Sequence, residues 1–192
     1  TLTRPGSSKN SENLDFGFID ETILHEYGHH LQNELSADNY PDYIGDSHSM
    51  CGEVGDYETA FSEGFANYFS MAVFHHYQDP SNPHFISPER YRDRSELENG
   101  CPDRRGNIEG NVMSALWDLV DRFDSDFPYS VDESFDRLSG LENFILEVLD
   151  TDMDNRVDAP DICEMRNCSR SVCSGLRSDF DSIFGRYGIS CR

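Results

Sequence analysis

The sequence predicts a mainly helical, disulfide-containing fold in a single domain that spans residues 1–192. Apolar residues recur at helical spacing in several separate stretches, whereas the alternation typical of strands is scarce. A chain of 192 residues can bury a sizeable core, to which 13 Phe and 9 Tyr contribute large apolar surfaces. The six cysteines form an even set without a Cys-x-x-Cys pair, which favours disulfides over a cysteine metal site.

The predicted helices follow one another along the chain. Residues 20–35 begin with two acids, which suit the positive end of the helix dipole, and carry an apolar stripe that includes Leu24 and Leu31. Residues 56–77 carry an aromatic stripe that includes Phe61 and Phe65. Further helices are expected over residues 107–123, 132–149 and 176–184.

The cysteines are unevenly distributed. Four of them fall in an acidic, cysteine-rich C-terminal segment, residues 150–192, where their close spacing predicts a local cluster. This leaves Cys51 with Cys101 as the remaining pair. Six cysteines allow 15 pairings, and within the C-terminal cluster the sequence does not choose among them.

Charge and hydropathy exclude some classes of function. With 37 acidic against 15 basic residues, the formal net charge is −22, which argues against nucleic-acid binding because phosphates would be repelled. We find no signal peptide and no apolar run long enough to span a membrane. Disulfides indicate a secreted, extracellular or cell-surface protein, so either a leader has been removed or the chain is part of something longer.

The sequence His25-Glu26-Tyr27-Gly28-His29 is an HExxH motif. Residues four apart lie on one face of a helix, so both imidazoles can reach one zinc ion. Glu26 lies beside the metal and can take a proton from an activated water. A chance match on a surface helix is the alternative, but the apolar stripe and the room that Gly28 leaves for another backbone favour a zinc site.

A catalytic zinc needs a third protein ligand. No histidine follows His29 at the spacing that some HExxH enzymes use, so a carboxylate from the next helix is expected. We predict Glu63 as this ligand, with Glu58 and Glu53 as the remaining alternatives. Asn67 lies one helical turn after Glu63 and can orient a ligating imidazole.

Two segments resemble the gluzincin metallopeptidases of the thermolysin and fungalysin type. HEYGHHLQNEL, from His25 to Leu35, is similar to their active-site helix, and SEGFANYFS, from Ser62 to Ser70, to their glutamate helix. Asn67 replaces the aspartate that is usual there. The resemblance implies a zincin-type metallopeptidase catalytic domain, here with a minimal or truncated N-terminal β-subdomain, because only about 20 residues precede the motif.

A weaker similarity covers residues 106–118, which resemble the helix that follows the family's transition-state histidine. In this register the histidine position falls at Gly106, next to Asn107. Another group must then stabilise the developing negative charge. The candidates are Asn107, Arg105, Tyr77 and Tyr43, of which Asn107 is kept as the predicted catalytic residue beside Glu26.

Residues 150–161 resemble an EF-hand or dockerin calcium loop, with oxygen donors at loop positions 1, 3, 5, 9 and 12 and the apolar Val157 at position 8. An acidic surface turn is the alternative. The expected calcium-site residues are Asp150, Asp152, Asp154, Arg156, Asp158 and Asp161.

The sequence therefore predicts a zinc-dependent endopeptidase that acts on protein or peptide substrates, with Zn²⁺ as its cofactor and Ca²⁺ as a second candidate. A catalytically inactive zinc-binding scaffold and a calcium-dependent interaction module remain the alternative functions. The oligomeric state is left open.

Overall fold

The computed structural model describes residues 20–36, 49–76, 100–120, 138, 140–151, 160–167 and 171–191. These residues are mainly helical, as predicted, and no strand occurs among them. An isolated antiparallel bridge pairs Glu53 with Ile108. Residues 1–19 lie outside the described part, and with them the expected N-terminal β-subdomain.

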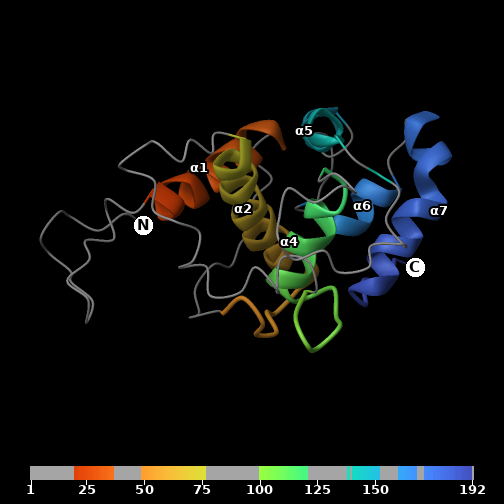
Figure 1. Cartoon of the computed structure of the whole chain (residues 1–192), viewed down its shortest axis with the longest axis horizontal. Helices are drawn as coiled ribbons and strands as arrows, with labels where there is room; N and C mark the ends of the chain where they lie inside the picture. Colours follow the sequence, from red (N-terminus) through yellow and green to blue (C-terminus); the bar gives the residue numbers. More distant parts are fainter. Residues whose placement is uncertain are drawn as a thin grey trace, which may run out of the picture.

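Six helices make up the described chain (Figure 1). They are α1 (Asp20–Leu35), α2 (Tyr57–His76), α4 (Glu109–Trp117), α5 (Glu142–Thr151), α6 (Ile162–Arg166) and α7 (Ser171–Arg186).

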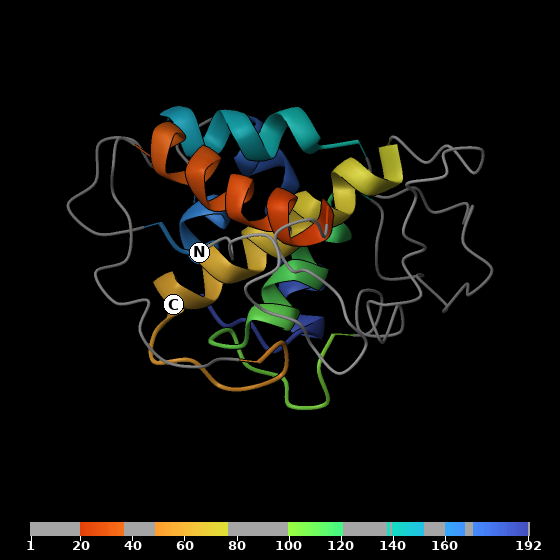
Figure 2. The same cartoon turned by 90° about the vertical axis from the view of Figure 1, so that its left-hand side faces the viewer.

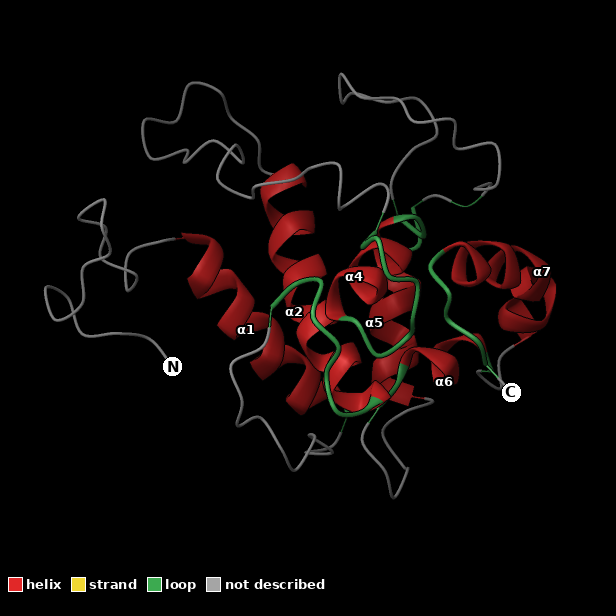
Figure 3. Cartoon of the chain, turned by 90° about the horizontal axis from the view of Figure 1, so that it is seen from below, coloured by secondary structure: helices red, strands yellow, loops and turns green. Residues whose placement is uncertain are grey.

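Helix α2 is the centre of the arrangement. It packs along α1 on one side and against α4 on another, and it also contacts α6. Helix α5 contacts α1, and Figure 2 shows α1 lying between α5 and α2. Seen from below in Figure 3, α1 and α7 lie at opposite ends of the row of helices. The HExxH helix therefore packs directly against the helix that carries Glu63.

Burial on all sides of α2 explains its central place. Residues 59–68 are all buried, so this helix has no continuous solvent-facing stripe. Two of its phenylalanines, Phe61 and Phe65, are fully buried and stack on each other. Two polar residues, Glu63 and Asn67, are carried into the interior with them. Burial of a carboxylate is costly unless the group meets a positive partner, so this position demands a chemical explanation.

The close packing of α2 against α4 depends on Gly64. A Cβ at this residue would lie 2.7 Å from Cβ of Val112 and 2.8 Å from the carbonyl oxygen of Glu109. Real Cβ atoms do not approach other heavy atoms this closely, so the absence of a side chain lets the helices approach each other. Glu63 is the neighbour of Gly64, and the close packing of α2 against α4 helps to bury Glu63.

The predicted helix over residues 132–149 is wrong at its described residues before Glu142, where α5 starts. Gly140 has a φ of 70° and donates its N–H to the carbonyl of Val120, and Leu141 donates to Leu119. These bonds tie the segment to the end of α4 in a non-helical conformation. Residues 121–137 lie outside the described part.

The other helix boundaries differ less. Helix α1 matches its predicted range, and α2 matches within one residue at each end. Helix α4 begins only after Ile108, which is extended at φ −121°, and ends at Trp117 rather than near residue 123. Sequence analysis missed α6, whose N-cap Asp161 accepts a hydrogen bond from the N–H of Glu164 at 3.0 Å. It also predicted α7 too short.

Two disulfides cross-link the described residues. Cys51 is bonded to Cys101, as predicted, and Cys163 to Cys191, a pair from within the C-terminal cluster. Disulfides persist in oxidising compartments, so these bonds agree with an extracytoplasmic location. Among the described helices, none combines the length and the apolar character needed to cross a bilayer.

Candidate metal centre

The side chains of His25, His29 and Glu63 converge at the interface between α1 and α2. Nε2 of His25 lies 3.0 Å from Nε2 of His29. Oε2 of Glu63 lies 3.3 Å from the first of these nitrogens and 3.4 Å from the second. The three atoms thus form a nearly equilateral triangle, assembled from two helices and from residues up to 38 positions apart in the sequence.

The size of this triangle fits zinc. Ligand atoms bound tetrahedrally at about 2.0–2.1 Å from zinc are separated from one another by about 3.3 Å. The two nitrogen-to-oxygen distances, 3.3 and 3.4 Å, match this separation, and the nitrogen-to-nitrogen distance of 3.0 Å is slightly shorter. Two imidazoles and one carboxylate form the ligand set that zinc hydrolases use, with the fourth position left for water or substrate.

The hydrogen bonds of the imidazoles support the same conclusion. Nδ1 of His25 lies 2.9 Å from Oδ1 of Asn67, an acceptor, which assigns the imidazole proton to Nδ1. The lone pair of Nε2 then points toward the carboxylate oxygen of Glu63 and toward the second imidazole. Such a gathering of electron-rich atoms in a partly buried site favours a positive charge among them, either a metal ion or a proton on an imidazole.

Nδ1 of His29 lies 3.2 Å from Oγ of Ser62, the residue before Glu63. Sequence analysis predicted Asn67 as an orienting residue but missed Ser62. The signal was weak, because a serine beside a predicted ligand points away from it on an ideal helix. Only the crossing of α1 over α2 places the serine hydroxyl within reach of the second imidazole.

Burial differs among the members of the site. The side chain of Glu63 is only 2% exposed, whereas the side chains of His25 and His29 keep 20% and 14% of their surface accessible. Glu26 is also partly exposed. The carboxylate ligand therefore forms the buried side of the centre, and the HExxH helix forms the side that a substrate could approach.

The electrostatics of the site favour positive charge at its centre. Burial lowers the pKa of His25, but the hydrogen bond and negative charge of Glu63, the hydrogen bond to Asn67 and the charge of Glu26 act more strongly in the opposite direction. The pKa of His25 therefore lies above its ordinary value. The same negative field would favour a metal cation when the imidazole is neutral.

The alternative third ligands are placed elsewhere. Glu53 forms an exposed ion pair with Arg105 at 2.7 Å and accepts a hydrogen bond from Asn107 at 2.8 Å. Glu58 lies in the first turn of α2. Within the described residues, the cluster of possible metal ligands at this site consists of His25, His29 and Glu63.

The predicted oxyanion-stabilising residue has other partners in the structure. The Asn107 amide donates to Glu53 at 2.8 Å and to the carbonyl of Val54 at 3.1 Å. These bonds connect the residue before Ile108 to the segment that precedes α2. Arg105 binds the same Glu53 carboxylate. A catalytic role for Asn107 stays a prediction, and the remaining candidates, Tyr43 and Tyr77, lie outside the described residues.

The calcium loop falls mostly outside the described residues as well. Asp150 lies near the end of α5, and Asp161 uses its carboxylate to cap α6. The intervening candidates, Asp152, Asp154, Arg156 and Asp158, are not described. Calcium binding by this segment therefore stays a prediction.

Comparison with known proteins links this centre to a family. The family model described as Mycolysin C-terminal domain matches residues 17–148, which include every member of the candidate metal centre. An uncharacterized protein from Archaeoglobus fulgidus is 37% identical over 180 residues, which cover 92% of this chain and 49% of that protein. The chain thus spans about half the length of this relative. No solved structure matches this chain significantly.

Proposed function

The chain belongs to the Mycolysin C-terminal domain family, which links it to a family of proteases, and on this basis we propose that it is a secreted, zinc-dependent endopeptidase of gluzincin type. The observation that carries the proposal is the triangle of Nε2, Nε2 and Oε2 atoms on His25, His29 and Glu63, with edges of 3.0 to 3.4 Å. The HExxH motif supplies two of these atoms and the general base beside them.

When bound, zinc would polarise the scissile carbonyl and make water a stronger nucleophile at neutral pH. His25, His29 and Glu63 would hold it, leaving one position open toward solvent. The chemistry supplied by the ion is thus hydrolysis without a covalent enzyme intermediate. Protein or peptide substrates fit this chemistry, as the family link to a protease also indicates.

The proton transfers are assigned to Glu26. Its carboxylate follows His25 directly on the same helix, and its charge acts on that imidazole. Glu26 would take a proton from the attacking water and then deliver it to the leaving amine, so that one group serves as base and acid in turn. Its partial exposure allows it to face both water and substrate.

Asn67 and Ser62 would keep the imidazoles in place through their Nδ1 atoms. Such partners fix the tautomer that presents the Nε2 lone pair to the metal and hold the ring orientation. An amide at position 67 accepts the hydrogen bond without adding a negative charge. We therefore expect His25 to be a slightly weaker ligand here than it would be beside a carboxylate.

The test combines metal analysis with a cleavage assay on the full chain. We expect about one zinc per chain, cleavage of a casein-type substrate, and loss of cleavage in the presence of a chelator. Glu26→Gln should lose at least about 100-fold in activity, since general acid–base catalysis contributes 10²–10⁴-fold, while retaining zinc. His29→Gln should lose both zinc and activity.

Two outcomes would reject the proposal. A chain that carries no transition metal after purification and reconstitution contradicts the metal centre itself. A chain that binds zinc through the three named residues but cleaves nothing indicates an inactive zinc-binding scaffold. Equal activity of wild type and Glu26→Gln would remove Glu26 from the mechanism.

A further inference from the structure

The amide of Asn67 must point in one particular direction to serve the metal centre. An amide offers an acceptor on one side and a donor on the other, whereas a carboxylate offers acceptors on both. If Asn67 turned over, its NH₂ group would face Nδ1 of His25. That orientation favours the proton on Nε2, which is the atom that zinc requires to be bare.

A side chain on the donor side of Asn67 can decide this orientation. Sδ of Met50 lies 3.9 Å from Nδ2 of Asn67, within the range of a weak hydrogen bond to sulfur. Oδ1 of the same amide is 2.9 Å from Nδ1 of His25. Sulfur accepts weakly and does not donate in a thioether, so this contact favours the orientation in which the amide nitrogen faces Met50.

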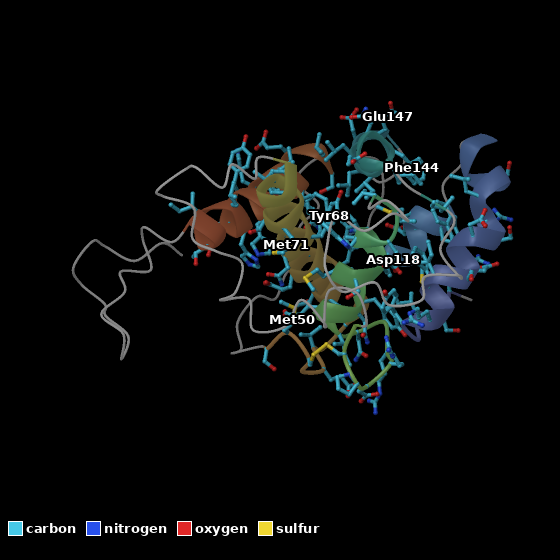
Figure 4. The ribbon with its side chains drawn as sticks, in the orientation of Figure 1. Met50, Tyr68, Met71, Asp118, Phe144 and Glu147 are labelled. Carbon is cyan, nitrogen blue, oxygen red and sulfur yellow. A yellow bond between two sulfur atoms is a disulfide. The ribbon has the colours of Figure 1, made fainter. Side chains whose placement is uncertain are left out.

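Met50 is itself held firmly. Its carbonyl accepts a hydrogen bond from the N–H of Gly110 at 2.9 Å, and its neighbour Cys51 is bonded to Cys101. A Cβ at Gly110 would lie only 2.8 Å from this carbonyl oxygen, so a glycine is required at position 110 for this hydrogen bond. Figure 4 places Met50 beside a disulfide, whereas Met71 lies on α2. The start of α4 and the disulfide thus fix the position of the sulfur.

We propose that Met50 is a positioning residue for the metal centre, whose sulfur fixes the Asn67 amide and through it the ring of His25. The inference rests on the proposed zinc site and adds to it a residue from outside both metal-binding helices. It also explains how an asparagine, which can turn over, can fill a position that needs a fixed acceptor.

The test measures zinc affinity of the full chain by competition with a chromophoric chelator. Loss of a group that orients a ligand costs 10–100-fold in metal affinity, and Met50 acts one step farther away, so Met50→Leu should weaken binding by about three- to tenfold. Met71→Leu is the matched control, because Met71 is a buried core residue of α2.

A role through Asn67 is separated from a general packing effect by a second background. In Asn67→Asp either oxygen can accept from His25, so adding Met50→Leu should change zinc affinity by less than about twofold. In zinc-loaded protein, the Nδ1–H signal of His25 should be protected from solvent exchange in wild type and exchange faster in Met50→Leu.

An equal loss of affinity in both backgrounds, or an unchanged Nδ1–H signal in Met50→Leu, overturns the proposal and leaves the zinc site intact. A zinc affinity of Met50→Leu equal to that of wild type also overturns the proposal and leaves the zinc site intact. A wild-type chain that binds no zinc overturns the proposed function and this inference together.

Discussion

Gly28 on α1 faces the backbone of Ala66 on α2 so closely that a Cβ on the glycine would lie 2.9 Å from Cα of the alanine. Gly28 belongs to the HExxH motif, and Ala66 lies between Glu63 and Asn67. This close contact between the two helices therefore lies beside the point at which the candidate metal ligands meet. The absence of a side chain at Gly28 lets the two helices pack closely, and this packing brings the imidazoles of α1 near the carboxylate of α2.

Gly28→Ala should push the helices apart by a few tenths of an ångström and lower the free energy of unfolding by about 1–3 kcal/mol, the range for overpacking a close contact. Zinc affinity should fall with it, because Glu63 moves away from His25 and His29. Urea unfolding and zinc competition measure the two effects.

The matched control is Gly175→Ala in the middle of α7, where a Cβ would meet nothing within 4 Å. This exposed helical position should gain about 0.5–1 kcal/mol in stability, since alanine favours the helix over glycine. Similar effects of the two substitutions would contradict the close-packing explanation.

Ser62→Ala should weaken zinc binding by about tenfold, because Nδ1 of His29 loses the oxygen at 3.2 Å that orients it. Ser62 is buried, so loss of this hydrogen bond should also lower the free energy of unfolding of the metal-free chain by about 1 kcal/mol. Ser178→Ala, on the exposed side of α7, is the control and should leave zinc affinity unchanged. An unaltered affinity in Ser62→Ala would show that this contact does not support the site.

Protons and zinc should compete for His25. Its pKa lies above the usual value of 6.5, mainly because Glu63 outweighs the effect of burial, and zinc binds only the neutral imidazole. Zinc affinity should therefore decline as the pH falls through this raised pKa. Competition assays across a pH series measure the midpoint of this decline in zinc affinity. In Asn67→Asp the midpoint should lie at a higher pH than in wild type, because the added carboxylate favours the protonated ring of His25.

The metal-free chain should show the opposite trend in stability. A group whose pKa is higher in the folded state stabilises the fold fully below its unfolded pKa and loses this contribution as the pH rises through the folded value. The thermal midpoint of the metal-free wild type should therefore fall more steeply with rising pH than that of His25→Asn. Parallel curves for the two proteins would show that His25 contributes nothing to this slope.

Replacement of both cysteines of the Cys51–Cys101 disulfide by serine should destabilise the chain by about 2–5 kcal/mol, because the bond closes a loop with a sequence separation of 50. It should also weaken zinc binding, since Cys51 anchors its neighbour Met50. The Cys163–Cys191 disulfide spans a separation of 28 and lies away from α1. Its removal should cost stability while leaving zinc affinity unchanged, which unfolding and competition experiments on the two variants can distinguish.

The sequence by itself determined the helical character of the described chain, the bounds of α1 and the candidate residues for a metal site. Helical periodicity is a local property, and the spacing of His25 and His29 fixes their common face without any tertiary information. The pairing of Cys51 with Cys101 was also predicted, since the other cysteines lie close together in the C-terminal segment.

Only the tertiary structure removed Glu53 and Glu58 from the site and added Ser62 and Met50 to the residues around the imidazoles. The sequence favoured Glu63 but kept Glu53 and Glu58 as alternatives, and the packing of α1 on α2 at Gly28 brings Glu63 to the imidazoles. Ser62 and Met50 reach the site through contacts between residues 33 and 17 positions apart. Such contacts depend on how helices cross, which follows from the burial of whole surfaces and not from the pattern of any one segment.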